Sequence, residues 1–396
     1  GERLHGMQEV IGSIPISSTI FSSIKATDFQ AIKAFVLKES ISMVVVGPED
    51  PLVLGIHDFF LADEQLKNVP VIGPSKEAAQ LEGSKDFAKA FMMRHGIPTA
   101  KYATFTKDTL EKGYAFLESM KAPYVLKADG LAAGKGVIVT SDRDAALAHA
   151  EKFIAMGILV EEFLDGQEVS LFFLSDGKTV LPLSPAQDFK RAYDNDEGPN
   201  TGGMGAYSPL PWLPDNFIEE VERTVAQPTV DELARLGAPF VGLLYCGLII
   251  TQRGVRVIEF NARFGDPETQ VVLRRLTNPL ESLLHRAATG RLAEGPSAQF
   301  SDDVAITVVL ASEGYPDTAA PDREISGLHE DANVEHCHAA TKLINGKLMA
   351  TGGRVLSVVA SAKNFNEARA LAYENIKQIH LEGSHFRNDI AKKVAD

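Results

Sequence analysis

Cysteines and long apolar runs are scarce in this chain. Its two cysteines, Cys246 and Cys337, cannot form a disulfide framework, which indicates a reducing compartment. No stretch approaches the roughly 18–20 apolar residues that a membrane-spanning helix needs. No secretory signal peptide is visible, although the sequence begins at Gly1 rather than at methionine. We therefore expect a cytoplasmic protein that does not interact with membranes.

Positive charge is also scarce, since 39 lysines and arginines face 53 aspartates and glutamates, for a formal net charge of −14. A nucleic-acid-binding surface needs clustered lysine and arginine, so that class of function is disfavoured. A local basic pocket for a nucleotide remains compatible with this charge. The apolar content of 45% is ordinary for a soluble globular protein. The length allows two or three domains with substantial cores.

A short polar pattern at residues 259–261 predicts a metal site. Residues 255–261 follow a glycine turn, are rich in β-branched side chains and predict a strand. Glu259 and Asn261 are two apart and therefore share a face of that strand. A carboxylate beside an amide oxygen, with room for water and phosphate oxygens, suits Mg²⁺. The alternative is a strand ending in polar residues, with Arg263 and Asp266 as a surface ion pair.

A glycine-rich turn is predicted between strands at residues 124–127 and 137–140. Such a turn exposes backbone N–H groups that can approach phosphates, and Lys127 and Lys135 add positive charge at its two ends. It is not a Walker loop, because Gly136 stands where a serine or threonine would hold Mg²⁺. The alternative is a hairpin with surface lysines.

Acidic residues lie in and after the next apolar strand, over residues 158–168. Two Asp-Gly pairs, at 165–166 and 176–177, predict that this strand and the one at 169–174 form an antiparallel meander. Carboxylates in so apolar a strand are costly unless they meet donors, and an adenine amino group or ribose hydroxyls are such donors. The alternative is an edge strand with solvated glutamates.

The N-terminal quarter predicts a parallel sheet. The apolar run at residues 41–46 is typical of a buried parallel strand, and a second strand is predicted at 69–72. Ligands bind beyond the carboxyl ends of such strands, so Glu49 is a candidate substrate contact, with a solvated turn as the alternative. Lys85 begins a predicted helix at 85–95, where its charge opposes the helix dipole and indicates an anionic partner.

The segment at residues 187–207 is predicted to be a long, glycine-dense irregular stretch, which in a compact domain indicates a functional loop. A helix at 216–236 and a strand at 241–250, antiparallel to the metal strand, follow. New strands begin near residue 303. His336 and His338 could share a strand face, but without further ligands nearby we interpret them as structural or pocket-lining.

Taken together, these motifs resemble the phosphoribosylamine–glycine ligases (glycinamide ribonucleotide synthetases), a family of ATP-grasp enzymes. The resemblance covers nearly the whole chain, and long runs such as Gly-Pro-Asn-Thr-Gly-Gly-Met-Gly-Ala-Tyr make coincidence implausible. The segments that carry it are residues 47–49, 81–85, 127–137, 161–166, 198–207, 259–268 and 351–356.

The resemblance implies an α/β (α+β) fold: an ATP-grasp fold with an N-terminal parallel-sheet domain and a small C-terminal α/β domain. The domains expected from it are residues 1–82, 83–300 and 301–396, with a nucleotide-covering subdomain at about 121–182. The implied activity joins glycine to 5-phosphoribosylamine through glycyl phosphate, giving glycinamide ribonucleotide, ADP and phosphate, in de novo purine biosynthesis. Its cofactor would be Mg²⁺ (or Mn²⁺), and the enzyme is expected to be a monomer.

The resemblance also assigns roles to residues. Metal binding falls to Glu259 and Asn261, and catalytic roles fall to Arg263, Lys127 and Lys135. The residues implied in ATP binding are Lys85, Lys127, Gly134, Lys135, Glu161, Glu162, Phe163, Leu164 and Glu168. The residues implied in binding the other substrates are Pro48, Glu49, Asp188, Lys190, Gly203, Met204, Arg263 and Asp266.

The sequence departs from the family pattern in two places. The family begins with a strand and a glycine-rich loop for the sugar phosphate, and nothing of that kind precedes Gly1. The segment between Met156 and Ile158 is also shorter than the family's second glycine-rich loop, and Gly157 is all that is left of it. We expect both segments to be omitted here rather than lost, because without phosphate contacts the remaining site would have no purpose.

Two other functions remain open. One is a different ATP-grasp reaction, either another carboxylate–amine ligase or a carboxylase that uses bicarbonate. The other is a non-catalytic nucleotide-binding module, which the joint presence of Glu259, Asn261, Arg263, Lys127 and Lys135 disfavours.

Overall fold

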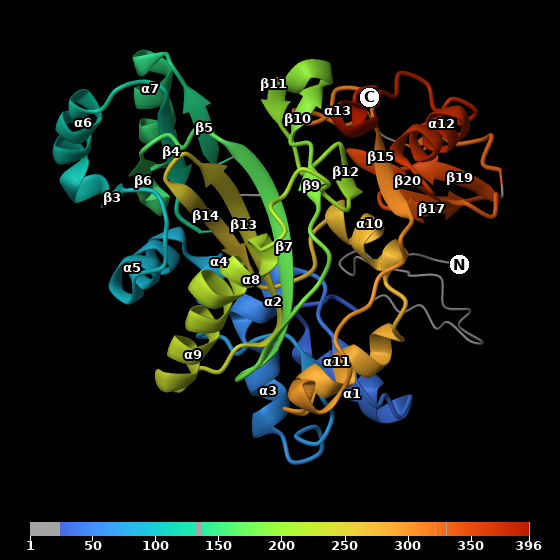
Figure 1. Ribbon diagram of the computed structural model, residues 1–396, viewed down its shortest axis with the longest axis horizontal. Helices are drawn as coiled ribbons and strands as arrows, with labels where there is room; N and C mark the ends of the chain where they lie inside the picture. Colours follow the sequence, from blue (N-terminus) through green and yellow to red (C-terminus); the bar gives the residue numbers. More distant parts are fainter. Residues whose placement is uncertain (1–23, 131–135, 321, 330, 396) are drawn as a thin grey trace.

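The computed structural model describes residues 24–130, 136–320, 322–329 and 331–395. Three groups of elements surround a central sheet (Figure 1). The N-terminal helices lie at one end of the view. A small sheet with its helices lies at the upper left, and the C-terminal strands and helices lie at the upper right. No helix in the described ranges is long and apolar enough to cross a membrane.

The N-terminal elements contain the predicted parallel pair. Strand β1 (Val44–Val45) pairs in parallel with β2 (Val71–Ile72), so both strands are present but shorter than the apolar runs suggested. Glu49 lies at the first turn of a helix rather than in an open turn. The surrounding helices are α1 (Phe29–Lys38), α2 (Glu49–Leu54), α3 (Ile56–Ala62), α4 (Gln80–Gly83) and α5 (Lys85–His95).

The small sheet at the upper left of Figure 1 carries the glycine-rich turn. Its strand order is β3-β6-β4-β5, and all its pairings are antiparallel. The two strands predicted on either side of this turn are confirmed as an antiparallel pair, with Lys127 opposite Val137. Helices α6 and α7 pack on this sheet around a small apolar core of their own. The elements are β3 (Tyr102–Phe105), α6 (Leu110–Ser119), β4 (Tyr124–Ala128), β5 (Val137–Thr140), α7 (Arg143–Phe153) and β6 (Ile158–Glu161).

The predicted meander across the first Asp-Gly pair is wrong. Strand β6 pairs with β3 and β4, whereas β7 (Gln167–Asp176) pairs with β13 (Val241–Thr251) in a different sheet. Gly166 lies tightly against β13, since a Cβ at this position would be 2.0 Å from the carbonyl oxygen of Ile250. Strand β7 therefore pairs with β13 from Gln167 to Asp176, and the Asp-Gly pair links two sheets. The second Asp-Gly pair does join β7 to β8 (Val180–Pro182), as predicted.

The central sheet has the strand order β14-β13-β7-β8. Strand β14 (Gly254–Asn261) is antiparallel to β13, as predicted, and places Glu259 opposite Gly247. Most of β13 is buried, and this sheet shares one apolar core with the N-terminal helices and the C-terminal strands.

The irregular stretch at residues 187–207 is partly strand. Its ends, β9 (Gln187–Asp188) and β12 (Gly205–Ser208), join three C-terminal strands in a sheet of order β17-β20-β15-β12-β9. The chain from residue 303 onward therefore extends a sheet that begins before it. The hairpin β10 (Arg191–Tyr193) and β11 (Glu197–Asn200) projects between β9 and β12.

The remaining elements complete the two larger groups. Helix α12 packs on strands β15 and β20. Their bounds are α8 (Phe217–Val221), α9 (Gln227–Arg235), α10 (Glu268–Arg275), α11 (Leu280–Ala288), β15 (Val304–Ala311), β16 (Arg323–Glu324), β17 (Val334–His338), β18 (Thr341–Ile344), β19 (Lys347–Ala350), β20 (Arg354–Ala362), α12 (Phe365–Ile376) and α13 (Lys392–Ala395).

The histidine pair at the C-terminal end makes polar contacts on and beside β17. His336 Nε2 lies 2.7 Å from Asn375 Oδ1, and His338 Nδ1 lies 3.1 Å from Thr341 Oγ1. Within the described ranges no group of three or more His, Cys, Asp or Glu side chains is arranged to hold a metal ion.

Candidate active site

A buried carboxylate joins the small sheet to the central sheet. Glu161, at the end of β6, is 3% exposed. Its Oε2 lies 3.1 Å from Lys89 Nζ and 3.2 Å from Lys127 Nζ. Although burial opposes ionisation, the two ammonium groups hold the pKa of Glu161 below its usual value. Lys89 also donates to Thr99 Oγ1 at 2.8 Å, and this hydroxyl donates to the backbone of β14.

Two lysines share one carboxylate, and burial lowers the pKa of Lys89 to about 8. Glu161 was predicted to contact ATP, but its Oε2 is occupied by the two lysines. Its Oε1 has no hydrogen-bond partner in the described part of the chain. Lys89 was not among the predicted site residues, although its place one turn after Lys85 on a helix was a usable signal.

Lys85 meets the glycine-rich turn, and the anion at the start of its helix is a protein side chain. Asp129 Oδ1 accepts hydrogen bonds from the backbone N–H groups of Lys85 at 2.6 Å and Asp86 at 3.2 Å. The Lys85 ammonium donates to the carbonyl oxygen of Gly130 at 2.8 Å. Burial lowers the pKa of Lys85. Gly134 and Lys135, the other predicted residues of this turn, lie outside the described residues.

The two predicted metal ligands lie together at the end of β14 and are both half-buried. Neither the Glu259 carboxylate nor the Asn261 amide has a hydrogen bond or ion pair within the described ranges. Their neighbours across the strand pair are Gly247 and Tyr245, and a Cβ at residue 247 would be 3.1 Å from Glu259 Cγ. Oxygen atoms left unpaired in this way fit a divalent cation that keeps water and phosphate oxygens as its other ligands.

Arg263 lies between two acids from the N-terminal helices. Its Nη2 is 3.3 Å from Glu82 Oε1, and its Nε is 3.5 Å from Glu49 Oε2. Glu82 Oε2 also accepts from the backbone N–H of Ala262 at 2.7 Å. Burial raises the pKa of Glu82 to about 7, although Arg263 opposes this shift. Glu82 was not predicted as a site residue, and it ties Arg263 and the end of β14 to α4.

Arg263 does not pair with Asp266, so the alternative of a surface ion pair between them is wrong. Asp266 instead faces Arg354 of β20, with its Oδ2 3.4 Å from Arg354 Nη2. Arg354 Nη1 also donates to the carbonyl oxygens of Asp266 at 2.8 Å and Gly202 at 2.7 Å. This arginine therefore joins the segment after β14 to the glycine-dense loop before β12.

The predicted substrate residues of that loop are buried. Gly203 has φ +110°, and a Cβ there would be 2.4 Å from Pro267 Cδ, so the close approach requires glycine. The Met204 side chain is fully buried, and its backbone N–H and C=O are used by Phe189 and Val309. Pro48, by contrast, lies at the N-cap of α2 and is partly exposed.

Asp188, Lys190 and Glu168 form a second charged cluster. Lys190 Nζ is 2.8 Å from Glu168 Oε2 and 3.7 Å from Asp188 Oδ2, and the Asp188 side chain is 6% exposed. Burial raises the pKa of Asp188 to about 7, even though Lys190 opposes the shift. Lys190 lowers the pKa of Glu168. The structure therefore brings together three residues that the sequence placed in two separate motifs.

Behind this cluster lies a buried hydrogen-bond chain that the sequence did not reveal. Tyr245 Oη donates to Glu268 Oε1 at 2.6 Å and lies 2.8 Å from Ser170 Oγ. Glu268 is 4% exposed, at the start of α10. Its negative charge is among the causes that raise the pKa of Asp188.

The segment after β6 has unpaired backbone groups. Glu162 accepts from the backbone N–H of Lys101 and from Arg253 Nη2, both at 3.1 Å. The backbone N–H and C=O groups of Phe163 and Leu164 make no hydrogen bond within the described ranges. Phe163 is 41% exposed, which is unusual for a residue with so apolar a side chain. A planar ligand could use both features.

The perturbed carboxyl groups predict opposite dependences of stability on pH. Because the folded pKa of Asp188 is raised, its contribution to stability is present at low pH and is lost as pH rises toward about 7. Asp188→Asn should therefore gain stability relative to wild type between pH 5 and pH 8, by more than about 1 kcal/mol. Thermal unfolding midpoints at several pH values measure this difference.

Glu168→Gln is the matched control for that experiment. The folded pKa of Glu168 is lowered, so its contribution to stability is present above its unfolded pKa and is lost as pH falls. The stability that Glu168→Gln loses relative to wild type should therefore be smaller at acidic pH. If the difference in unfolding midpoint between Asp188→Asn and wild type does not change with pH, then the pKa of Asp188 is not raised by burial.

Comparisons with known proteins agree with this geometry. Profiles of the phosphoribosylglycinamide synthetase N domain, ATP-grasp (A) domain and C domain match residues 7–82, 83–269 and 305–393. The phosphoribosylamine–glycine ligase of Leifsonia xyli is 56% identical, with 92% of this chain and 87% of the relative covered. That of Streptomyces coelicolor is 53% identical, with 94% and 89% covered.

Solved structures give the same result. The Thermotoga maritima phosphoribosylamine–glycine ligase has a TM-score of 0.77 at 32% identity, covering 89% of this chain and 86% of that one. The biotin carboxylase domain of Hydrogenobacter thermophilus 2-oxoglutarate carboxylase has a TM-score of 0.70 at 18% identity, covering 91% and 79%, and shows the shared fold alone. The three domain matches and the identity with these relatives show that the chain belongs to the phosphoribosylglycinamide synthetase family.

Proposed function

We propose that this protein is an ATP-dependent ligase that joins glycine to 5-phosphoribosylamine and gives glycinamide ribonucleotide, ADP and phosphate. The observation that carries the proposal is the pair of unpaired oxygen ligands, Glu259 and Asn261, on a strand whose backbone contacts the Lys89–Glu161–Lys127 cluster. The relatives named for this reaction support the choice of substrates.

The reaction needs an activated acid, because a carboxylate is a poor electrophile. The γ-phosphoryl group of ATP is transferred to the glycine carboxylate, and the amine then displaces phosphate from glycyl phosphate. Phosphoryl transfer depends mainly on positioning and on neutralising charge. Lys127, with Lys85 and Lys135, would neutralise the phosphate oxygens. A bound Mg²⁺ or Mn²⁺ held by Glu259 and Asn261 would supply further neutralisation of the β- and γ-phosphates.

The nucleotide would lie between the small sheet and the central sheet. The unpaired backbone groups of Phe163 and Leu164 would read the adenine edge, beside Glu162. Glu168 would accept from the ribose hydroxyls, in exchange for part of its contact with Lys190. Glu161 would contribute by holding Lys127 in place, and Gly134 would bring backbone N–H groups close to phosphate.

The other substrates would bind toward β9 and the N-terminal helices. Arg263, held between Glu82 and Glu49, would orient the glycine carboxylate or the transferring phosphoryl group. Asp188 and Lys190 would contact the amine substrates. Pro48 and Glu49 border the same region, while Gly203, Met204 and Asp266 would shape it through the loop contacts of Arg354.

The domain limits expected from the sequence, 1–82, 83–300 and 301–396 with a nucleotide-covering part at about 121–182, remain our proposal. The small sheet runs from β3 to β6, over residues 102–161, whereas β7 and β8, which lie within the last of these limits, belong to the central sheet. We also propose that the enzyme is a cytoplasmic monomer.

The proposed reaction predicts how ADP release depends on substrates. ADP should form from Mg·ATP only when glycine and phosphoribosylamine, generated in situ, are both present, and not when alanine replaces glycine. A coupled assay for ADP measures this. ADP release driven by a different acid or amine would change the assigned substrates. ATP binding without any ADP release would overturn the ligase proposal.

The metal assignment predicts a loss of turnover. Glu259→Ala should lower kcat on the order of 100-fold, because charge neutralisation at the phosphates is lost. Glu111→Ala, at an exposed position of α6, is the control and should leave kcat unchanged. Near-normal turnover in Glu259→Ala, with an unchanged unfolding midpoint in both variants, would refute the assignment.

The place of Glu82 predicts a role in holding Arg263. Glu82→Gln keeps an acceptor for the Ala262 N–H group but removes the carboxyl group that faces Arg263. We expect kcat to fall roughly tenfold with the fold retained, because a small displacement of a positioned group has a large effect on rate. Steady-state kinetics and a circular dichroism melt check this, and an unchanged kcat would contradict it.

A further inference from the structure

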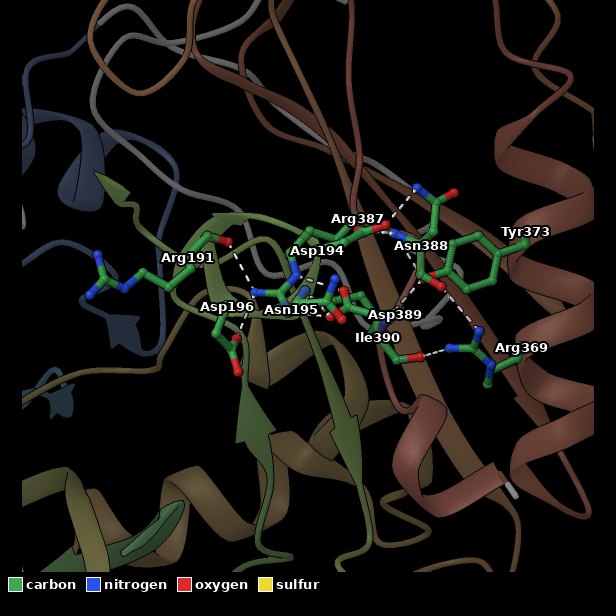
Figure 2. A network of polar contacts seen from close by, with 10 residues as sticks. All are labelled: Arg191, Asp194, Asn195, Asp196, Arg369, Tyr373, Arg387, Asn388, Asp389 and Ile390. Atoms are coloured by element: carbon green, nitrogen blue, oxygen red, sulfur yellow. Dashed lines mark hydrogen bonds and ion pairs between the residues drawn. The ribbon is translucent and has the colours of Figure 1, made fainter. Parts of the chain in front are cut away.

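A buried arginine near the C-terminus contacts the segment that carries the amine-site residues. Arg387 has a side chain that is 1% exposed, and it lies between its own segment and the β10–β11 hairpin (Figure 2). The hairpin and the C-terminal segment are separated by nearly 200 residues of sequence, since Asn388 and Asp194 are 194 positions apart. Arg387 has no part in the proposed chemistry, so its burial has another reason.

The charge of Arg387 is compensated on both sides. Asp389 accepts from its Nε at 2.8 Å and from its Nη2 at 2.7 Å, and Asp196 accepts from its Nη1 at 2.9 Å. A buried guanidinium with such a fork of partners tolerates little displacement, because each lost bond leaves a desolvated charge. Arg387 therefore restrains the residues that it contacts.

Two of its contacts lie on either side of Lys190. The guanidinium stacks over the ring of Phe189, with its central carbon 4.8 Å from the ring centroid. Its Nη1 donates to the carbonyl oxygen of Arg191 at 3.1 Å. The Lys190 carbonyl oxygen is itself bonded by Thr201, so Lys190 is held at its own backbone and at both neighbours. Arg387 thereby restrains the direction in which Lys190 and the nearby Asp188 project.

The hairpin tip has a conformation that needs such support. Asn195 and Asp196 have φ values of 60° and 57°, in the left-handed region that non-glycine residues seldom adopt. Asp389 accepts from the Asn195 N–H group at 2.9 Å, and Asp194 accepts from the Asn388 N–H group at 2.7 Å. On the other side, Arg369 and Tyr373 of α12 contact the same C-terminal segment, as Figure 2 shows.

We propose that Arg387 is a positioning residue for the ligase reaction, acting through Phe189 and Arg191 to aim Lys190 and Asp188 at the amine substrates. The C-terminal segment thus sets the geometry of a site whose charged groups belong to the central part of the chain. The kinetic part of this inference rests on the proposed function. The structural part, that Arg387 holds the Lys190 ammonium between Glu168 and Asp188, does not.

The test compares two variants that each remove polar contacts from the same interface. Arg387→Met keeps an apolar stem of similar length but removes both contacts beside Lys190. Asp194→Ala removes the bonds to Asn388 at 2.7 Å and 3.1 Å and touches neither neighbour of Lys190. Per folded molecule, Arg387→Met should lower kcat by about tenfold or more with the KM for ATP within about twofold, and Asp194→Ala should keep both values.

A second readout does not depend on the substrates. Lys190 acylation by an N-hydroxysuccinimide ester, followed by mass spectrometry of the whole protein's peptides, should be several-fold faster in Arg387→Met and unchanged in Asp194→Ala. Unchanged acylation of Lys190 in Arg387→Met would overturn the positioning role. A wild-type enzyme that releases no ADP with glycine and phosphoribosylamine would sink the proposed function instead, and the acylation result would still decide the positioning role.

Stability could complicate Arg387→Met, so Phe189→Leu provides a milder variant. It removes the ring under the guanidinium and leaves the ion pairs with Asp389 and Asp196 in place. It should show the same pattern of lower kcat and faster Lys190 acylation with a smaller amplitude. Arg387→Lys, which keeps the charge but not the fork, should recover part of the loss. Equal kcat and equal acylation in Phe189→Leu and wild type would contradict the proposal.

Discussion

The Glu161 carboxylate, shared by Lys89 and Lys127, is the interaction on which the candidate site depends. It joins β6, β4 and α5 at one buried point, and Lys89 extends the connection through Thr99 to the backbone of β14. Removing one partner of such a cluster would leave an uncompensated buried charge, which is strongly destabilising. Lys89, Lys127 and strand β14 are therefore held in a fixed arrangement.

The same principle recurs at each border of the site. Glu82 and Glu49 hold Arg263, Asp129 caps the helix of Lys85, and Arg387 with its two aspartates holds the hairpin beside Lys190. Arg263 and Arg387 are each held by carboxylates from distant parts of the chain, and Asp129 accepts from the backbone of the helix that carries Lys85. The positive groups are fixed before any substrate arrives, which favours preorganised neutralisation of phosphate.

Local elements and motifs could be predicted well from the sequence because their signals are short-range. The hairpin around the glycine-rich turn, the antiparallel pair that carries Glu259 and Asn261, and the helix from Lys85 all follow from alternation, glycines and capping residues. The prediction that the strands on either side of the first Asp-Gly pair are partners was wrong, because a turn signal does not indicate which sheet the next strand joins. Glu82, Lys89, Glu268 and Arg387 were missed because single charged residues carry no local signature of a distant partner.

The amino-acid sequence by itself determined the family and the local strands and helices, and it suggested the proposed metal-ligand pair. These properties depend on residue types at fixed spacing along the chain. Only the tertiary structure decided which charges neutralise one another, which of them are buried, and that β9 and β12 share a sheet with the C-terminal strands. Those properties depend on the packing of segments far apart in sequence, where burial and opposite charge, rather than spacing, select the partners.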